Sequence, residues 1–390
     1  KNPRLIPCSV QTINIPSLTA SAGASGTSII QVPCGSSAGL MCNPYLRLSL
    51  QTTQTANAAN SRSFKGSVGA ATALINNIST YVNSVQVDNI QSYDQVMDIL
   101  LAHSTSNDYL THDGQVLMTC NVADASASSY QLATSAVATY CIPLVGLLGS
   151  QQAFPLYLVN GVLQLQINYN SIARAFFCVT NAPTSMTISN VQLVYDRVQP
   201  EQAFVDSVRN SMMLSGAKYV YGYTNYQCST MNSLNGQQTL NYGLNVSSLR
   251  GLVSNQITTA DLSDATAQGL SKVNGLSQYI VSLDGRLLNN NVLDAVSTPA
   301  VVFAEANKCM GRLFDASISD TSTASNYTTN NFFVGVSAQR TSENLAFSGS
   351  PVSIVGQQVT TTSANCTLHN VFISDYQLLL DVSGSCEIIR

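Results

Sequence analysis

Apolar and polar residues alternate in the middle of the chain, directly after the pair Asn160-Gly161. The apolar positions are Leu163, Leu165, Ile167 and Tyr169, and the polar ones are Gln164, Gln166, Asn168 and Asn170. A period of two predicts a half-buried β-strand. Asn-Gly favours the two positive φ angles of a type I′ turn. We therefore predict that Phe154–Asn170 forms a β-hairpin.

Short apolar or alternating segments predict further strands across the first half of the chain. They are Ser28–Val32, Leu46–Gln51, Val116–Asn121, Thr139–Leu144, Ala175–Thr180 and Thr187–Tyr195. The opening segment, Leu5–Ile15, lies among prolines and predicts an extended arm or an edge strand, because proline cannot donate to a sheet. Runs of such strands are typical of a β-sandwich.

Two segments of the first half carry apolar residues at helical spacing. Gly66–Val82 predicts one helix, and Ser92–His103 predicts a second with a capping box of Ser92 and Gln95. His103 ends the apolar stripe of the second helix, so we expect a packed or surface side chain rather than a ligand. Asp94 and Asp98 lie four residues apart on that helix, and we expect them on its solvated face.

The pattern changes near residue 198. Gln199-Pro200-Glu201 is typical of a helix start, with proline in the first helical position, and Val198–Ser215 predicts a helical connector. The division is then an N-terminal sandwich with an extended arm over 1–197, the connector over 198–215, and a C-terminal sandwich over 216–390.

The second half repeats the plan of the first. Its expected strands are Tyr219–Thr224, Tyr279–Asp284 with a turn at Asp284-Gly285, Phe332–Gln339, Val352–Thr360, Thr367–Ile373 and Gln377–Val382. Thr298-Pro299 begins a predicted helix with Val302, Ala306, Cys309 and Leu313 on one stripe.

Two matches indicate a duplication. Thr187–Leu193 resembles Thr367–Ile373 at an offset of 180 residues, and the helix starts at Ser92 and Thr298 are offset by 206. Both offsets lie close to half of the 390 residues, as expected for one sandwich copied in tandem.

The chain is poor in charge. Charged residues make up 9% of it, against about 25% in ordinary soluble proteins. A surface this weakly charged is poorly protected against association, so we expect other copies of the chain to cover much of it. The net charge of −4, without a basic run, disfavours sequence-independent nucleic-acid binding. No segment approaches the about 18 apolar residues of a membrane-spanning helix.

The candidate chemistry is sparse. The ten cysteines are scattered without a CxxC pair and are expected to be small buried hydrophobes. Glu305 lies in an apolar helix, where we expect a buried hydrogen-bond partner, with a general acid as the alternative. Asp261 and Asp264 faintly resemble a cation loop without the spacing of a calcium hand. The tyrosines from Tyr219 to Tyr226 predict a core or interface face rather than a sugar platform. We predict no catalytic, cofactor-binding or metal-binding residue.

Three segments, taken together, resemble the double jelly-roll major capsid proteins of the adenovirus and tectivirus lineage. They are Phe154–Asn170, Asn190–Asp196 leading into the helix at Pro200, and Tyr279–Arg286. They are most similar in character to the capsid proteins of virophages and polinton-like viruses. The resemblance extends over nearly the whole chain.

This resemblance implies a mainly β chain of two tandem eight-stranded jelly-roll sandwiches, with short helices in the loops between strands. It implies a homotrimer of pseudo-hexagonal outline in the icosahedral capsid shell of a virion, assembled in the host cytoplasm or nucleus. The implied partners are neighbouring capsomers, penton proteins and minor capsid or cement proteins, and contact with an internal membrane stays open. No enzyme activity, cofactor or sequence-specific nucleic-acid binding is implied. Two alternatives remain: a secreted or surface β-sandwich adhesin or lectin, and a minor double jelly-roll capsid subunit.

Overall fold

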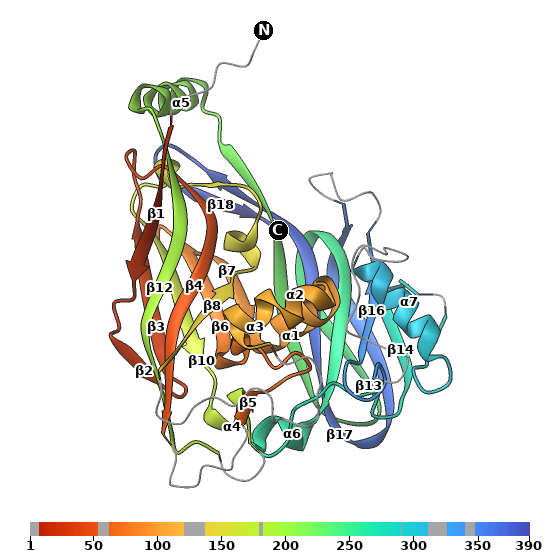
Figure 1. The fold of residues 1–390 in the computed structure, drawn as a ribbon. Coiled ribbons are helices and arrows are strands. Elements are labelled where there is room, and N and C mark those ends of the chain that lie inside the picture. The colour runs from red at the N-terminus through yellow and green to blue at the C-terminus, as the bar shows by residue number, and fades with distance from the viewer. Residues whose placement is uncertain are drawn as a thin grey trace.

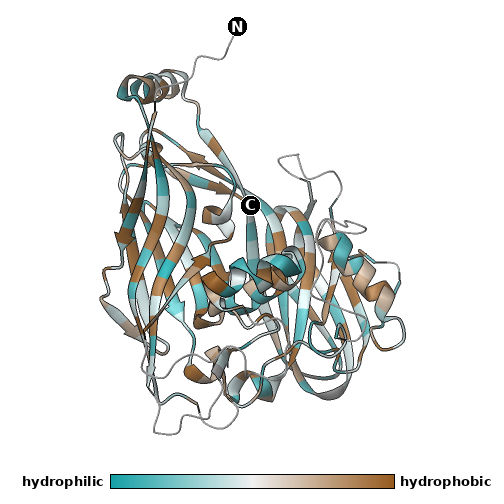
Figure 2. Ribbon diagram, in the orientation of Figure 1, coloured by the Kyte–Doolittle hydropathy of each residue, from teal (hydrophilic) through white to brown (hydrophobic). Residues whose placement is uncertain are grey.

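A computed structural model describes residues 8–53, 62–120, 137–178, 182–289, 291–310, 326–339 and 348–390. Two β-sandwiches stand side by side, the first in the red to lime part of the chain and the second in the green to blue part (Figure 1). Apolar and polar positions alternate along many of their strands (Figure 2). The apolar side chains fill the space between the sheets, and this burial is the main driving force for the fold.

The first sandwich consists of two sheets whose strands run antiparallel. One sheet has the order β1-β12-β4-β8, with β2 and β9 attached, and the other has the order β3-β10-β6-β7. Their bounds are β1 Cys8–Pro16, β2 Ser21–Gly23, β3 Thr27–Pro33, β4 Leu40–Thr53, β6 Ile75–Val82, β7 Val85–Gln91, β8 Ala138–Pro143, β9 Phe154–Pro155, β10 Val162–Tyr169 and β12 Ser185–Pro200. β5 Arg62–Phe64 pairs with β11 Phe176–Cys178 as a separate ribbon.

The second sandwich is built around two very long strands, β13 (Tyr219–Thr258) and β17 (Ser350–Leu380). Each bends and passes from one sheet to the other. In β13, residues 219–231 pair with 368–380, residues 236–246 pair with 352–361, and residues 251–258 pair with 366–373. β14 (Leu276–Leu283) and β15 (Arg286–Leu287) extend one layer, β16 (Phe333–Ser337) extends the other, and β18 (Cys386–Ile389) pairs with the end of β17.

Lettering the strands B to I in chain order gives the same arrangement in both halves. In the first half, β1, β12, β4 and β8 form a sheet B-I-D-G, and β3, β10, β6 and β7 form a sheet C-H-E-F. In the second half, residues 219–231, 366–380, 249–258 and β16 form B-I-D-G, and residues 236–246, 350–361, β14 and β15 form C-H-E-F. The predicted pair of tandem jelly-roll sandwiches is confirmed. The two matched sequences, at 187 and 367, both lie in strand I.

Helices lie mainly in the loops between strands. They are α1 Tyr93–Ser104, α2 Asn107–Thr111, α3 Asp113–Met118, α4 Ile172–Ala175, α5 Gln202–Ser215, α6 Thr259–Ser263 and α7 Pro299–Cys309, with short 3₁₀ turns η1 Ala71–Leu74, η2 Gly146–Gly149 and η3 Leu156–Leu158. Both α1 and α7 follow strand F of their sandwich, as the two predicted helix starts require. Of the stripe predicted on α7, Val302, Ala306 and Cys309 are buried, and Leu313 lies outside the described residues. No described helix has both the length and the apolar character needed to cross a membrane.

The helix between the two sandwiches begins later than the sequence predicts. Residues 198–200 still belong to β12, because Pro200 pairs with Cys8 at the end of strand β1. Glu201 is the N-cap residue, and α5 starts at Gln202. The helix lies at one end of the molecule beyond β1 and β12 (Figure 1), and most of its side chains are exposed.

The predicted hairpin over Phe154–Asn170 is wrong, although its second strand is right. β10 alternates between buried and partly exposed residues as expected, but its partners are β3 and β6. Phe154 pairs instead with Met41 of β4 in the opposite sheet, and Leu156–Leu158 form a 3₁₀ turn. The segment therefore crosses between the sheets rather than folding back on itself. Asp284-Gly285, by contrast, forms the predicted turn, with φ of 48° and 80°.

Two other local predictions are wrong. Of the helix expected over Gly66–Val82, Ile75–Val82 form strand β6 and Ala71–Leu74 form a 3₁₀ turn. In the strand expected at Val116–Asn121, residues 116–118 belong to helix α3, and Asn121 lies outside the described residues. The opening segment, by contrast, is an edge strand, one of the two forms predicted for it, since Cys8–Pro16 pairs along its whole length with β12 as an outer strand of the sheet; residues 5–7 of that prediction lie outside the described residues.

Candidate functional site

The two sandwiches contact each other along an interface that we call the seam. The first sandwich contributes Lys65, β7, α1 and η2 to it, and the second contributes its strands B and D, β16 and α6. At its upper end, strand B of the second sandwich directs alternate side chains toward the first. Tyr221 Oη donates to the carbonyl oxygens of Leu147 (3.3 Å) and Gln152 (2.9 Å), and Tyr223 Oη donates to the carbonyl oxygen of Val87 (2.7 Å). Both tyrosines are buried, which confirms the predicted interface face for these residues.

Asp88 is a buried acid at the centre of this contact. Its Oδ1 accepts from Asn225 Nδ2 at 2.8 Å, across the seam, and its Oδ2 accepts from the backbone N–H of Leu147 at 2.9 Å. Burial raises the pKa of Asp88 to about 7, against the opposing effect of these hydrogen bonds. The carboxyl group therefore titrates near neutral pH at a point where the two sandwiches are joined.

Helix α1 fills the middle of the seam, and the prediction that Asp94 and Asp98 are solvated is wrong. Asp94 forms a 2.9 Å ion pair with Arg174, and the side chain of Asp94 is only 3% exposed. Asp98 accepts hydrogen bonds from the backbone N–H groups of Ser67 (3.0 Å) and Val68 (2.9 Å). Burial raises the pKa of Asp98, partly offset by these two bonds. The helix is enclosed on several sides, so these acids bind partners inside the protein.

The same helix contacts the second sandwich directly. Gln95 Oε1 accepts from Asn255 Nδ2 at 2.9 Å, and the ring of His103 stacks on Phe333 with centroids 3.6 Å apart. His103 is therefore a packed side chain, as predicted. The capping box is wrong, because Ser92 has a positive φ of 47° and its side chain does not cap the helix.

At the lower end of the seam, the faint cation loop around Asp261 holds the ammonium group of a lysine. Lys65 Nζ donates to the backbone carbonyl oxygens of Asp261 (2.6 Å) and Asp264 (2.7 Å). Burial lowers the pKa of Lys65 to about 8, opposed by Asp264 and then Asp261. Across the described residues, no cluster of three His, Cys, Asp or Glu side chains could hold a metal ion.

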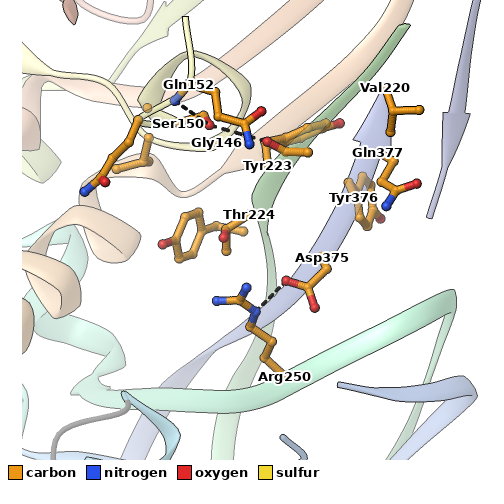
Figure 3. Close-up of a pocket in the computed structure, with 15 residues that line it drawn as sticks. Gly146, Ser150, Gln152, Val220, Tyr223, Thr224, Arg250, Asp375, Tyr376 and Gln377 are labelled. Carbon is orange, nitrogen blue, oxygen red and sulfur yellow. Dashed lines mark hydrogen bonds and ion pairs between the residues drawn. The ribbon is translucent and has the colours of Figure 1, made fainter. Parts of the chain in front are cut away.

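A cavity of about 550 Å³ opens at the seam between the two sandwiches (Figure 3). Arg250 Nε lies 2.5 Å from Asp375 Oδ1, and Asp375 Oδ2 accepts from the hydroxyls of Ser248 and Ser348. The lining residues are Val145, Gly146, Gly149, Ser150, Gln151, Gln152, Val220, Gly222, Tyr223, Thr224, Tyr226, Arg250, Asp375, Tyr376 and Gln377. This lining contains no histidine or cysteine and a single carboxylate, which is already paired with Arg250. It provides polar contacts but lacks the acid–base pair of a hydrolase.

The remaining candidate residues are Glu305 and the cysteines. Glu305 is not buried in the chain: its side chain is 31% exposed and accepts from Lys308 Nζ at 2.5 Å on the surface of α7. All ten cysteines are free thiols, and five of them are buried. Burial raises the pKa of Cys309 to about 12, which is typical of a packed thiol rather than a nucleophile.

Neither a protein-family model nor a curated protein matches this sequence. Solved structures match its fold over almost its whole length. The Faustovirus major capsid protein aligns at a TM-score of 0.68 and 8% identity, over 98% of this chain and 92% of that chain. The fold is a double jelly roll. VP54 of PBCV-1, fitted into a reconstruction of the virophage Sputnik, aligns at 0.66 and 11% identity, over 100% and 98% of the two chains.

The major capsid protein of mavirus matches the same double jelly roll at a TM-score of 0.53 and 10% identity, over 97% of this chain and 89% of that chain. The sequence pattern predicted this fold but not the charged residues buried at the contact between the two sandwiches. Asp88 and Lys65 find their partners across that contact, Asp88 137 residues away in Asn225, and Arg174 pairs with Asp94 within the first sandwich. The scarcity of charge in the sequence could have indicated these residues, because a charged residue in an otherwise uncharged segment often has a specific partner.

Proposed function

We propose that this chain is a viral major capsid protein, a structural component of the virion shell. The supporting observation is the strand order B-I-D-G and C-H-E-F in both halves, together with end-to-end similarity to capsid proteins of several viruses. Because the fold alone does not determine function, the low charge of the chain provides the second argument. A surface with few charges is suited to burial against further copies.

Its action in this proposal is mechanical. Three copies form a capsomer in which six sandwiches approximate a hexagon, and capsomers tile an icosahedral shell with penton and minor capsid or cement proteins. In the proposed division, residues 1–200 form the first unit, 201–215 the connector and 216–390 the second unit; the first boundary moves from 197 to 200 because β12 continues to Pro200. Closed symmetry buries the weakly charged flanks. The proposal includes no catalytic step, since the polar cavity at the seam offers no acid–base pair.

Purified protein tests the proposal directly. Mass measurement in solution should give three chains per particle, and negative-stain microscopy should show three-lobed particles of near-hexagonal outline. A stable monomer at micromolar concentration and neutral pH would contradict the proposal. The adhesin or lectin alternative receives no support from the cysteines, because all ten are free thiols rather than the disulfides common in secreted domains.

A further inference from the structure

The cavity at the seam has a wall from each sandwich (Figure 3). The first sandwich contributes residues between 145 and 152, a segment that contains the turn η2. The second contributes residues of strands D and I and the alternate positions of strand B, which are Val220, Gly222, Thr224 and Tyr226. A molecule that fills the cavity therefore contacts both sandwiches at once.

We infer that this cavity binds a small neutral molecule with several hydroxyl groups, of the size of a monosaccharide. Its volume of about 550 Å³ lies in the range of about 300–1,000 Å³ that is typical of small-molecule sites. The inference goes beyond the proposed role in a capsid shell, and neither one depends on the other.

The charges in the cavity wall are paired within the protein. Arg250 and Asp375 are the two charged residues among those that line the cavity, and they form an ion pair of 2.5 Å. The other carboxylate oxygen of Asp375 accepts from the hydroxyls of Ser248 (2.5 Å) and Ser348 (3.3 Å) and from the backbone N–H of Ser348 (3.0 Å). Moving an ion from water into a site without a free counter-charge is costly. The site therefore favours an uncharged ligand.

The guanidinium group of Arg250 still has hydrogen-bond donors to offer. It meets Asp375 through Nε, and no described residue accepts a hydrogen bond from its two terminal amino groups. Figure 3 shows these amino groups on the side of Thr224. A guanidinium group presents its donors as a rigid planar fork. Two neighbouring hydroxyl oxygens of one ligand fit such a fork.

Three further polar groups of the wall have no hydrogen-bond partner in the described part of the chain. They are the hydroxyls of Thr224 and Tyr226 and the side-chain amide of Gln377, and all three residues are half-buried. Each of these groups can both donate and accept. A ligand hydroxyl also does both, whereas an ionised carboxylate only accepts. This match of donors and acceptors is the reason for assigning a ligand with several hydroxyl groups.

An aromatic pair completes the wall. The rings of Tyr223 and Tyr376 lie edge to face, with centroids 5.8 Å apart, and both residues line the cavity. Aromatic rings provide apolar contact area beside the polar groups. A hydroxylated carbon ring matches this combination, because it carries C–H groups as well as hydroxyls.

Titration of the full chain with D-glucose and with myo-inositol tests the inference. Both probes are neutral rings with several hydroxyl groups, and sodium sulfate and cyclohexanol serve as a charged and an apolar probe. We expect calorimetry to show saturable binding of at least one of the two polyhydroxyl probes at one site per chain, and no binding of sulfate or cyclohexanol. Binding of glucose alone would indicate a sugar site, and binding of inositol alone a cyclitol site.

Two substitutions in the cavity wall have matched controls on strand C of the second sandwich. Gly222→Leu adds a side chain where a Cβ meets no atom within 4 Å, and Gly243→Leu does the same outside the cavity. Thr224→Val removes one hydroxyl at nearly constant size, and Thr239→Val does so at an exposed site. We expect Gly222→Leu to abolish binding and Thr224→Val to weaken it about fivefold. Both controls should bind as the wild type does.

Circular dichroism and thermal unfolding establish that each variant is folded. If Gly222→Leu does not fold, the comparison of Thr224→Val with Thr239→Val decides. The inference is wrong if neither polyhydroxyl probe binds the wild type, if sulfate or cyclohexanol binds in their place, or if folded Gly222→Leu binds as tightly as Gly243→Leu. The mass of the particle in solution tests the capsid proposal separately.

Discussion

Asn225 Nδ2 donates a 2.8 Å hydrogen bond to Asp88 Oδ1, and this bond joins strand B of the second sandwich to strand F of the first. Both side chains are buried, with exposures of 5% and 4%. A buried acid costs free energy unless it is neutral or fully hydrogen-bonded. The stability of the two-sandwich unit should therefore depend on the proton that Asp88 carries.

Replacing Asp88 with Asn should flatten the dependence of stability on pH. The pKa of Asp88 is about 7 in the folded chain against an ordinary value of 3.8, so the folded state holds the proton more tightly than the unfolded state. The contribution of Asp88 to stability is full below about pH 4 and is lost as the pH rises through 7, amounting to about 4 kcal/mol at most. Asn offers one acceptor oxygen, whereas the Asp88 carboxyl group accepts from two donors. The variant should therefore have a lower free energy of unfolding than the wild type at pH 4. Denaturant unfolding from pH 4 to 8 should show the gap from wild type narrowing as the pH rises; a constant gap would contradict this.

Replacing Arg174 with Met should leave Asp94 buried without its cation. We expect a loss of about 3 kcal/mol in the free energy of unfolding, because an uncompensated buried charge is strongly unfavourable. Adding Asp94→Asn to the same chain should recover more than half of the loss. Lys218→Met is the control, since it breaks an exposed pair with Glu387 and should leave the stability close to that of the wild type. If the effects of Arg174→Met and Asp94→Asn on the free energy of unfolding were additive, the two residues would not be coupled.

Replacing Lys65 with Met should loosen the lower end of the seam. The ammonium group satisfies two backbone carbonyl oxygens, of Asp261 and Asp264, and removing it leaves both without that donor, at a cost of about 2 kcal/mol. Hydrogen exchange should quicken selectively in residues 261–268. Lys308→Met, which breaks only the surface pair with Glu305, should leave that segment unchanged. Equal exchange in both variants would show that Lys65 does not hold the loop.

Replacing Gly285 with Ala should destabilise the second sandwich by about 1 kcal/mol. Gly285 has φ of 80° in the turn after β14, and a Cβ there meets no atom within 4 Å, so the cost comes from the left-handed backbone alone. Gly243→Ala is the matched control, because that site is equally open and its φ is not positive. Thermal unfolding of the two variants should separate them. Equal melting temperatures would mean that the turn relaxes without strain.

The duplicated sandwich could be predicted from sequence because strands leave a local signal. β10 alternates as its side chains do in space, and Asp284-Gly285 forms a turn that depends only on its own backbone. The signal failed where tertiary pairing determined the structure. Asn160-Gly161 has the sequence of a hairpin turn, but Phe154 before it pairs with β4, and Asn160 Nδ2 donates to the carbonyl oxygen of Val382 in the other sandwich.

Helical spacing also gave a wrong prediction for residues 66–82. Ile75, Ile78 and Val82 are all buried, although 75 and 78 would face opposite sides of a regular strand, because the pairing of β6 with β10 shifts register between Ile75 and Asn77. A bulge of this kind breaks the strict alternation that distinguishes a strand from a helix. The acids of α1 were misjudged for a related reason: their partners, Arg174 and the turn at Ser67, lie far from the helix in sequence.

The position of strand I in each sheet determines when that sheet can close during synthesis. β12 lies between β1 and β4, and the last leg of β17 lies between two legs of β13. Neither B-I-D-G sheet can therefore close until its final strand leaves the ribosome. The first sandwich completes near residue 200, before β13 of the second sandwich is translated, and domains generally fold as units during synthesis. Until β13 emerges, Asp88 and Gln95 face water, so the nascent first sandwich exposes a polar surface that a later part of its own chain will cover.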